Sequence, residues 1–338
     1  MPETKFETIS LEKPNLEAIT EAAEILRRGG LVAFPTETVY GLGADALNAE
    51  AVQKVFDAKG RPPDNPLIVH IADRRQLIDL ADDIPQKGQR LAKEFWPGPL
   101  TLVVRKTFLV PDIVTAGLNT VAIRMPDHPV ALALIEEVNS GLVGPSANIS
   151  GRTSPTTAQH VLEDLNGRID MILNAGATEI GIESTVIDVT VDPPVILRPG
   201  GLHKETLEDI IGPTQVSTDA EALRRSPGTR HRHYAPKARM ILVRTGDVPA
   251  MRDFLKVNRQ QGKSVGCIVH SPDLARIESG GFFRVLPAPL EFFARYLFRT
   301  IRELDQEGVD VILVEEVEEG GLGLAVMDRL RRASETHS

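Results

Sequence analysis

The hydrophobic positions in the first part of the chain follow two different periods. Short apolar runs bounded by proline or glycine occupy residues 67–72, 100–106 and 120–126, and GLVGPS, MILNAG, STVIDVT and VILRPGG are similar. Runs of this kind are typical of β-strands. Apolar residues recur at helical spacing in LEAITEAAEILRRGG, AEAVQKVFDAKG, RQLIDLADDI and HPVALALIEEVN, which predicts helices there. Strands and helices without strict alternation predict a mixed α/β domain.

The pattern changes after residue 211. Residues 212–238 are rich in Pro, Ser, Thr and basic side chains, a composition typical of a linker or an ordered arm. Residues 239–338 then alternate strand-like and helical runs, which predicts a small parallel sheet covered by helices. We therefore predict a larger mixed α/β domain at 1–211, an arm at 212–238 and a smaller Rossmann-like α/β domain at 239–338.

Composition and charge argue against several classes of protein. The 338 residues carry a formal net charge of −9, which argues against a surface that binds nucleic acid everywhere. No apolar run reaches the roughly 18 residues that a membrane span needs, and the N-terminal sequence has no apolar signal core. The single cysteine, Cys267, cannot form an internal disulfide. We therefore expect a cytoplasmic protein with no membrane contact.

Common catalytic motifs are incomplete or missing. The run 262–264 (GKS) resembles the end of a phosphate-binding loop, but Val257 stands where that motif needs a glycine. The run 41–46 (GLGADA) matches only a looser dinucleotide fingerprint, and PTET interrupts the strand before it. No HExxH, paired CxxC or GxSxG occurs, and the histidines lack metal-ligand spacing. These absences predict no protein metal cage, no serine hydrolase and no thiol enzyme.

Strand alternation predicts which polar side chains share a face. In residues 67–71, the three odd-numbered apolar residues take one face, and Ile68 and His70 take the other. A histidine at such a position is as readily a core residue as a ligand contact. If PTETVY continues the strand before it, Thr36, Thr38 and Tyr40 share a face, although a threonine-rich edge strand is the alternative.

One predicted strand contains an arginine among apolar residues. Thr120 and Arg124 fall on the same face of the run 120–126. An unpaired buried charge costs several kcal/mol, so Arg124 needs an anionic partner. Either a structural Asp or Glu or the carboxylate of a ligand would serve.

Several loops carry groups suited to binding an anion. Lys59, Arg61 and Asn65 lie in KGRPPDNP, where three prolines stiffen the chain and hold the donors in a fixed direction. The planar guanidinium of arginine grips phosphate oxygens well. The run 144–148 (GPSAN) ends an apolar stretch in small polar residues, and Arg198 precedes a glycine turn.

Taken together, these segments resemble a known family. PTETVYGLG, KGRPPDNPLIVH, FWPGPLTLV, VAIRMPDHP, GPSANISG, ESTVID and ILRPGG occur in this order over about residues 15 to 205, and they resemble the YrdC-like threonylcarbamoyl-AMP synthases. SPGTRHRHYAPKA and EEGGLGLAVMDRLRRA resemble the long form of that family, which adds a linker and a C-terminal domain. The resemblance implies a YrdC-like catalytic domain at 1–211 with a twisted mixed sheet and flanking helices.

The resemblance also implies a reaction and its partners. Such enzymes join L-threonine, bicarbonate or CO2, and ATP into threonylcarbamoyl-AMP and pyrophosphate, with Mg2+ arriving on the ATP. The product goes to a tRNA threonylcarbamoyl transferase complex that modifies an adenosine beside the anticodon. Neither chemical step needs a protein nucleophile, so positioning and cations would carry catalysis. A weak direct contact with tRNA is left open.

Roles for individual residues follow from the resemblance alone. The implied catalytic residues are Lys59, Arg61 and Arg124. Threonine would be bound by Thr38, His70, Arg124 and Ser184, with Arg124 on its carboxylate. ATP would be bound by Arg61, Asn65, Thr120, Ser146, Ser154, Arg198 and Tyr234.

Two alternatives and one open question accompany this interpretation. The same basic loops could form an RNA-binding module, against which stand the net charge and only 4% aromatic residues. A carbamoyl transferase with another acceptor is the second alternative. The basic arm, with Tyr234 and His233 reaching inward, would shield the water-sensitive product, or it is an ordinary spacer.

Overall fold

The computed structural model describes residues 3–10, 15–217, 219, 225–226, 234–277, 282–286 and 288–334. Its contacts divide the chain into two compact units. The first comprises Met1–Ser150, Ser154–Glu179 and Glu183–Arg230, and the second comprises Gly151–Thr153, Ile180–Ile182 and His231–Ser338. The predicted arm is thus shared between the units, and its residues 218, 220–224 and 227–233, with His233 among them, lie outside the described residues.

The first unit contains one mixed sheet of twelve strands within the described residues. Its order is β1-β9-β2-β3-β8-β4-β7-β6-β10-β11-β12, and β5 pairs with the end of β6. Parallel and antiparallel neighbours alternate irregularly, as β4 runs parallel to β7 and antiparallel to β8. The strands are β1 Lys5–Thr8, β2 Val32–Phe34, β3 Gly41–Asp45, β4 Ile68–His70, β5 Ala81–Asp83, β6 Leu100–Lys106, β7 Thr120–Arg124, β8 Leu142–Val143, β9 Met171–Asn174, β10 Thr185–Asp188, β11 Val195–Arg198 and β12 Gln215–Val216.

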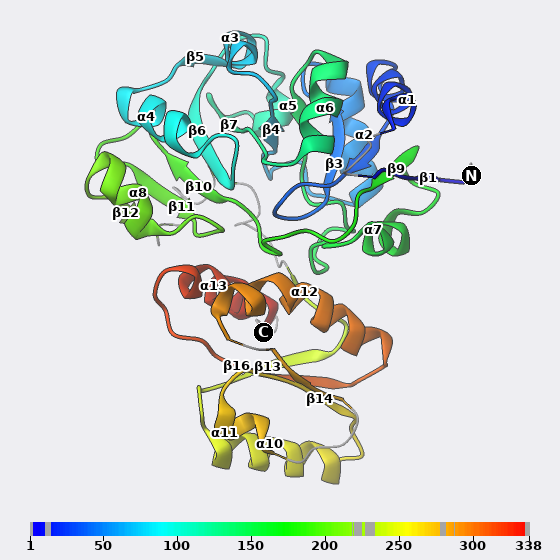
Figure 1. Cartoon of the computed structure of the whole chain (residues 1–338), viewed down its shortest axis with the longest axis vertical. Coiled ribbons are helices and arrows are strands. Elements are labelled where there is room, and N and C mark those ends of the chain that lie inside the picture. Colours follow the sequence, from blue (N-terminus) through cyan, green and yellow to red (C-terminus); the bar gives the residue numbers. More distant parts are fainter. Residues whose placement is uncertain are drawn as a thin grey trace. The chain divides into compact units, whose positions relative to one another are not determined.

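Helices flank this sheet and begin at recognisable capping residues. The side chain of Asn48 accepts the N–H groups of Glu50 and Ala51, and His128 caps a helix whose first residue is Pro129. Figure 1 shows α1 and α6 side by side. The helices are α1 Leu16–Arg27, α2 Ala49–Lys59, the 3-10 turn η1 Arg74–Gln76, α3 Leu77–Leu80, α4 Gln86–Phe95, α5 Asp112–Thr115, α6 Pro129–Val138, α7 Ala158–Leu165 and α8 Lys204–Ile211.

The two faces of the sheet bury different hydrophobic clusters. Ala33 belongs to the largest cluster, whereas its neighbours Val32 and Phe34 belong to the cluster under α1 and α6. Further along the sheet, the face opposite the largest cluster carries only a small apolar group that includes Ile68 and Ala122. His70 of β4 and Thr120 and Arg124 of β7, three of the residues predicted to bind substrate, lie on this second face.

The second unit is a parallel sheet with helices on both faces, as predicted. Its described strands are ordered β13-β16-β14-β15. One hydrophobic cluster includes residues of α10 and α11, and a separate one includes residues of α12 and α13, which lie across the sheet in Figure 1. The elements are β13 Arg239–Val243, α10 Val248–Gln260, β14 Val265–Val269, α11 Pro272–Ala275, β15 Phe283–Val285, α12 Leu290–Gln306, β16 Val311–Glu315 and α13 Leu322–Ser334.

A buried carboxylate joins the ends of three strands in this second unit. Glu315, the last residue of β16, accepts backbone N–H groups of Gly246 at 2.9 Å, His270 at 2.7 Å and Ser271 at 2.9 Å. The carboxyl ends of parallel strands are where α/β folds bind anionic ligands. Here the carboxylate of Glu315 itself accepts the hydrogen bonds of the backbone N–H groups at these strand ends.

The mixed α/β class is confirmed, and one predicted helix is wrong in part. The run RQLIDLADDI was expected to be helical, but α3 ends at Leu80 and Ala81 turns to extended backbone. Ala81 pairs with Lys106, beyond the part of β6 that pairs with β10. Beyond β10, this edge of β6 is therefore left open to the segment as a strand partner, which helical periodicity could not reveal. No helix in the described residues is long and apolar enough to cross a membrane.

Candidate active site

Strand β4 and its flanks place His70 on the polar face of the sheet. Leu67, Val69 and Ile71 join the largest hydrophobic cluster, while Ile68 joins the small cluster on the other face. The predicted alternation is confirmed. His70 consequently lies beside Arg124, its partner in the parallel pairing of β4 with β7.

Arg124 is held by contacts to all three of its guanidinium nitrogens. Nε donates to the carbonyl of Gly98 at 3.2 Å, and Nη1 donates to Oγ1 of Thr38 at 2.9 Å. Nη2 lies 2.6 Å from Oε2 of Glu37. Arg124 and Glu37 are both buried, so the guanidinium has little rotational freedom.

Glu37 is the functional candidate that sequence reasoning missed. The sequence required an anionic partner for Arg124 but did not say which residue would supply it. The structure supplies Glu37, which stands next to the predicted Thr38. Its signal was the acidic residue in the polar PTET segment, whose conformation could not be predicted from alternation.

The PTET segment does not continue β2, so the conditional strand prediction for it is wrong. β2 ends at Phe34 and β3 begins at Gly41. Between them, Oγ1 of Thr36 accepts the N–H groups of Thr38 and Val39 at 3.2 Å each and lies 2.6 Å from the carbonyl of Val39. This local hydroxyl–backbone turn competes with strand pairing, and it directs Thr38 toward Arg124.

His70 is a neutral imidazole in this environment. Burial, and to a smaller extent the positive charge of Arg124, lowers the pKa of His70 to about 3. Its ring and that of Phe34 are T-shaped to one another, with centroids 5.8 Å apart. Its Nδ1 is buried and has no hydrogen-bond partner among the described residues. A β-carbon on Gly144 would lie 2.6 Å from that nitrogen, so the glycine leaves room for the ring.

A second chain of contacts connects Arg124 with Arg198. Thr101 of β6 pairs with Arg124, and its hydroxyl lies 2.8 Å from that of Ser184. Arg198 Nη2 donates to the carbonyl of Ser184 at 2.9 Å and to its hydroxyl at 3.2 Å. Ser184 therefore lies between the predicted threonine residue Arg124 and the predicted ATP residue Arg198.

Ser154 and Thr120 occupy two further buried positions. Oγ of Ser154 donates to Oε1 of Glu183 at 2.5 Å, and Glu183 directly precedes Ser184 in the chain. Thr120 begins β7 on the face that carries Arg124 and is also buried. Both residues belong to the first unit, as predicted, and their contact with ATP stays a prediction.

Lys59 connects the basic loop with the 144–148 loop. Its Nζ donates to the carbonyls of Ser146 at 2.5 Å and Asn148 at 2.6 Å. Burial, and secondarily the charge of Arg61, holds the pKa of Lys59 well below its usual value. The hydrogen bonds from Nζ thus fix the loop that carries Ser146.

Arg61 and Asn65 are held inside their own loop. Arg61 Nε donates to the carbonyl of Asn65 at 3.3 Å, and Nη2 donates to that of Pro66 at 2.9 Å. Asn65 is fully buried. These bonds give the guanidinium a fixed direction, which is what the prolines of the segment predicted.

Tyr234 belongs to the second unit. Its ring stacks on Phe298 with centroids 5.3 Å apart, and the guanidinium of Arg329 lies 5.6 Å from its centroid. Tyr234 also has a positive φ of 65°. These contacts anchor the end of the predicted arm, and the role of Tyr234 at ATP stays a prediction.

Two other features offer little chemistry. Burial raises the pKa of the Cys267 thiol to about 12, so it is a poor nucleophile. The described residues contain no group of three or more His, Cys, Asp or Glu side chains that could hold a metal ion.

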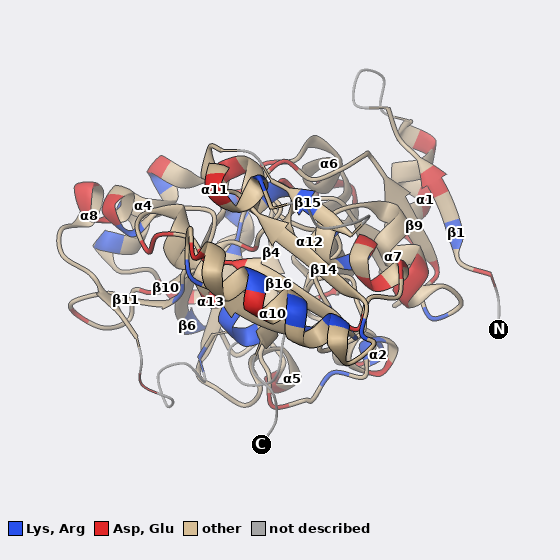
Figure 2. Cartoon of the chain, turned by 90° about the horizontal axis from the view of Figure 1, so that it is seen from below, with Lys and Arg blue, Asp and Glu red and all other residues tan. Residues whose placement is uncertain are grey.

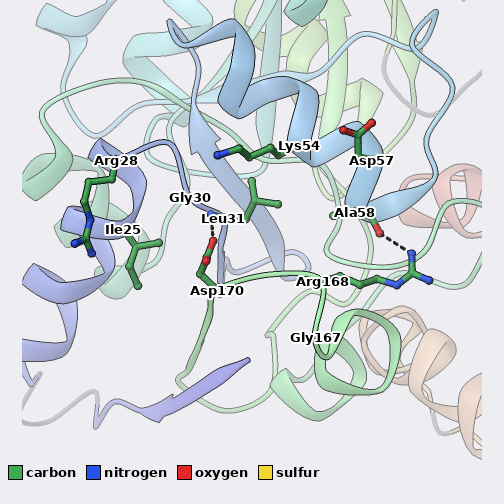
Figure 3. A pocket seen from close by; sticks show the side chains of 10 residues that line it. All are labelled: Ile25, Arg28, Gly30, Leu31, Lys54, Asp57, Ala58, Gly167, Arg168 and Asp170. Atoms are coloured by element: carbon green, nitrogen blue, oxygen red, sulfur yellow. Dashed lines mark hydrogen bonds between the residues drawn. The ribbon is translucent and has the colours of Figure 1, made fainter. Parts of the chain in front are cut away.

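A separate cavity of about 790 Å³ lies beside α1, α2 and the turn before β9 (Figure 3). Its polar groups are largely engaged with the backbone. Asp170 accepts the N–H of Leu31 at 2.7 Å, Arg168 donates to the carbonyl of Ala58 at 3.3 Å, and Lys54 donates to a backbone carbonyl at 2.7 Å. None of the predicted site residues lines this cavity.

Comparison with known proteins covers nearly the whole chain. The family model described as "Telomere recombination" matches residues 24–200, and "Threonylcarbamoyl-AMP synthase, C-terminal domain" matches residues 202–335. The threonylcarbamoyl-AMP synthase of Pyrococcus abyssi is 51% identical over 324 residues, which cover 93% of each chain. That of Bacillus subtilis is 47% identical over 322 residues, which cover 94% of this chain and 92% of the relative.

A solved structure agrees with the whole fold. The crystal structure of P. abyssi Sua5 complexed with L-threonine superposes with a TM-score of 0.92 at 47% identity, covering 98% of each chain. The sequence matches and this superposition lead to the same assignment. The chain belongs to the threonylcarbamoyl-AMP synthase family, whose members are nucleotidyltransferase-type enzymes.

Proposed function

We propose that this enzyme joins L-threonine, bicarbonate or CO2, and ATP into threonylcarbamoyl-AMP and pyrophosphate on the polar face of the first sheet. The observation that carries the proposal is that Arg124 lies opposite Thr101 in the sheet, and that hydrogen bonds connect Thr101 with Ser184 and Ser184 with Arg198. This chain places two fixed guanidinium groups within one network. A tRNA threonylcarbamoyl transferase complex would then consume the adenylate.

The threonine half of the site would use Thr38, His70, Arg124 and Ser184. The P. abyssi relative was crystallised with L-threonine, which supports an amino-acid site in this fold. Arg124 would bind the carboxylate, and Glu37 would act as a positioning residue that fixes the guanidinium. A neutral His70 carries no charge that would repel the ammonium group of the substrate.

The reaction needs one new bond to carbon and one to phosphorus. The ammonium group of threonine first loses a proton to water. The resulting amine attacks the carbon of CO2, one C–O π bond breaks, and a second proton passes to water, which gives a carbamate. A carbamate oxygen then attacks the α-phosphorus of ATP, and the bond to the β-phosphate oxygen breaks to release pyrophosphate. Negative charge develops on the phosphoryl oxygens, where fixed cations stabilise the transition state.

The nucleotide half would surround these phosphates with groups from several loops. Arg61 and Arg198 would bind phosphate oxygens, and Lys59 would hold the 146–148 loop in place. Magnesium would enter as part of the MgATP substrate, held by phosphates and water, because such sites need few protein ligands. The remaining proposed ATP contacts are Asn65, Thr120, Ser146, Ser154 and Tyr234.

A direct assay tests the reaction. Purified protein would be incubated with MgATP and labelled bicarbonate plus each amino acid in turn, and pyrophosphate and labelled adenylate would be measured. We expect product with threonine. Absence of product with every amino acid, together with tight binding of tRNA, would support the RNA-binding module instead.

Single substitutions test the assignment of the two halves. Arg61→Ala and Arg198→Ala should raise the KM for ATP, while Arg124→Ala should mainly raise the KM for threonine. Each lost charged hydrogen bond contributes about 1.5–3 kcal/mol, or roughly 10–150-fold in binding. Arg75→Ala is the matched control, because Arg75 is exposed and forms a surface ion pair with Asp73. Equal kinetics in all four variants would refute the assignment.

A further inference from the structure

The second unit carries a basic groove that the proposed reaction does not use. It lies between α10 and the residues after α11, has a volume of about 770 Å³, and is here named the α10 groove. Its cations are Arg252, Lys256 and Arg259 of α10, with Arg276 opposite, whose guanidinium lies 3.8 Å from the carboxylate of Asp273. In Figure 2, blue bands mark the basic residues along α10. All of the lining belongs to the second unit.

Helical geometry brings three of these cations into one row. Arg252, Lys256 and Arg259 are four and three residues apart, so they share one face of α10. The helical rise separates them by roughly 6 and 4.5 Å along the axis. Met251 and Leu255 are buried against the sheet, which fixes the rotation of the helix and keeps the row at the groove.

The row has no acidic partner within the described part of the chain. Arg252, Lys256 and Arg259 make no ion pair there, whereas the exposed Arg299 of α12 pairs with Glu303 at 2.8 Å. Like charges at this spacing on one helix face repel one another. An external anion would relieve that repulsion.

The shape and chemistry of the groove indicate which anion fits. Cations in a row match an anion whose charges repeat every few ångströms, as the phosphates of a nucleic acid do. Three of the four cations are arginines, whose planar guanidinium groups bind phosphate oxygens in pairs. The apolar lining residues Leu255 and Ile277 are buried, so the groove offers no exposed anchor of the kind that protein partners use.

We propose that the α10 groove binds the phosphate backbone of RNA. No aromatic side chain lines it, so contact with stacked bases is not built in and recognition is independent of sequence. The groove would hold an RNA substrate of the downstream modification close to the enzyme that supplies the activated group. The binding itself does not depend on the proposed adenylate chemistry.

The test measures RNA binding by the full chain at several salt concentrations. A fluorescein-labelled RNA hairpin would be titrated by anisotropy between 50 and 200 mM salt. The variant Arg252→Ala/Lys256→Ala/Arg259→Ala should bind at least roughly tenfold more weakly at low salt, and its log K against log salt slope should fall by roughly 2–3.

A charge-matched control distinguishes the effect of removing the groove cations from the effect of changing the net charge. The variant Lys5→Ala/Arg75→Ala/Lys87→Ala removes the same number of cations from exposed surface pairs of the first unit. Its affinity and salt slope should equal those of the parent. Thermal melts followed by circular dichroism would verify that both variants fold. If the triple groove variant does not fold, Lys256→Gln should still lower the slope by roughly 1.

The outcomes are distinct. Equal affinity and slope for the parent and the groove variant would overturn the proposal, as would tighter binding of labelled polyglutamate than of RNA. Pyrophosphate release with threonine should persist in the groove variant, because its residues touch no part of the proposed reaction. If the parent bound RNA through the groove but released no pyrophosphate, the proposed reaction would fail and this inference would stand.

Discussion

The buried pair of Glu37 and Arg124 should be a strong determinant of the stability of the first unit. Their closest atoms are 2.6 Å apart, and the two side chains are 6% and 4% exposed. Desolvation offsets most of the attraction in such a pair, but removal of one partner leaves an uncompensated buried charge that costs about 3–5 kcal/mol. Glu37→Gln keeps the shape and removes the charge, so we expect a loss of about 3 kcal/mol.

The single tryptophan provides a specific assay for this unit. Trp96 is buried in the first unit, and its Nε1 donates to the carbonyl of Leu100 at 2.7 Å. Its fluorescence during urea unfolding therefore reports on the unit that contains Glu37. With a slope of about 2 kcal/mol per M, the midpoint should fall by roughly 1–2 M.

A double variant tests whether an uncompensated buried charge causes the loss of stability. Glu37→Gln combined with Arg124→Met removes both charges and should recover most of the lost stability, because no charge remains buried without a partner. The exposed pair of Arg75 with Asp73 is the control, and Arg75→Gln should change stability by less than about 1 kcal/mol. If Glu37→Gln unfolds at the parental midpoint, or if the double variant loses the sum of both single losses, the reasoning is refuted.

Three further predictions follow from buried groups. Gly144→Ala should displace His70 and raise the KM for threonine at least tenfold. Gly320→Ala is the control, because a β-carbon there meets no atom within 4 Å, and it should leave this KM unchanged. Equal KM values for the two variants would contradict the prediction. Burial raises the pKa of Tyr40 to about 12. The neutral phenol therefore contributes fully to the stability of the fold below pH 10, and this contribution is lost between pH 10 and 12. The free energy of unfolding from urea titrations should fall by about 2–3 kcal/mol more across this range in the parent than in Tyr40→Phe. Burial opposes the charge of Glu315, but hydrogen bonds from the ends of β13 and β14 hold its pKa below the ordinary value of 4.5. The contribution of the Glu315 carboxylate to stability is therefore complete above that pH and lost as the pH falls. Glu315→Gln should lower the melting temperature measured by circular dichroism at pH 7, while tryptophan fluorescence still reports a stable first unit.

Long regular elements could be predicted from the sequence because local pattern and tertiary context agree in them. β6 spans Leu100–Lys106 as its apolar run predicted, and α6 begins at Pro129 after the cap His128. One predicted helix was wrong in part, because the residues of β5 follow a helical period but form a strand. The strand conformation of β5 depends on pairing with the edge of β6 beyond β10, and β6 is a partner distant in sequence.

Parts of the site could be predicted for the same reason. Alternation correctly placed His70 on the face of β4 that carries Ile68, and Thr120 with Arg124 on one face of β7. The contacts of Ser184 with Thr101 and Arg198 were not accessible in this way. They depend on which strands lie side by side, and the sequence does not state the strand order.

The identity of the partner of Arg124 shows where inference from sequence reaches its limit. Physical chemistry required an acid beside a buried guanidinium, and both Glu37 and Glu183 are buried acids of the same unit. Glu183 is engaged by Ser154 instead. The choice of Glu37 depends on the hydroxyl of Thr36, which closes a turn that a continuous strand would not contain. Side-chain alternation assigns Thr36 a direction by assuming that the strand continues. It cannot predict the turn, because the hydroxyl of Thr36 itself makes the hydrogen bonds that compete with strand pairing.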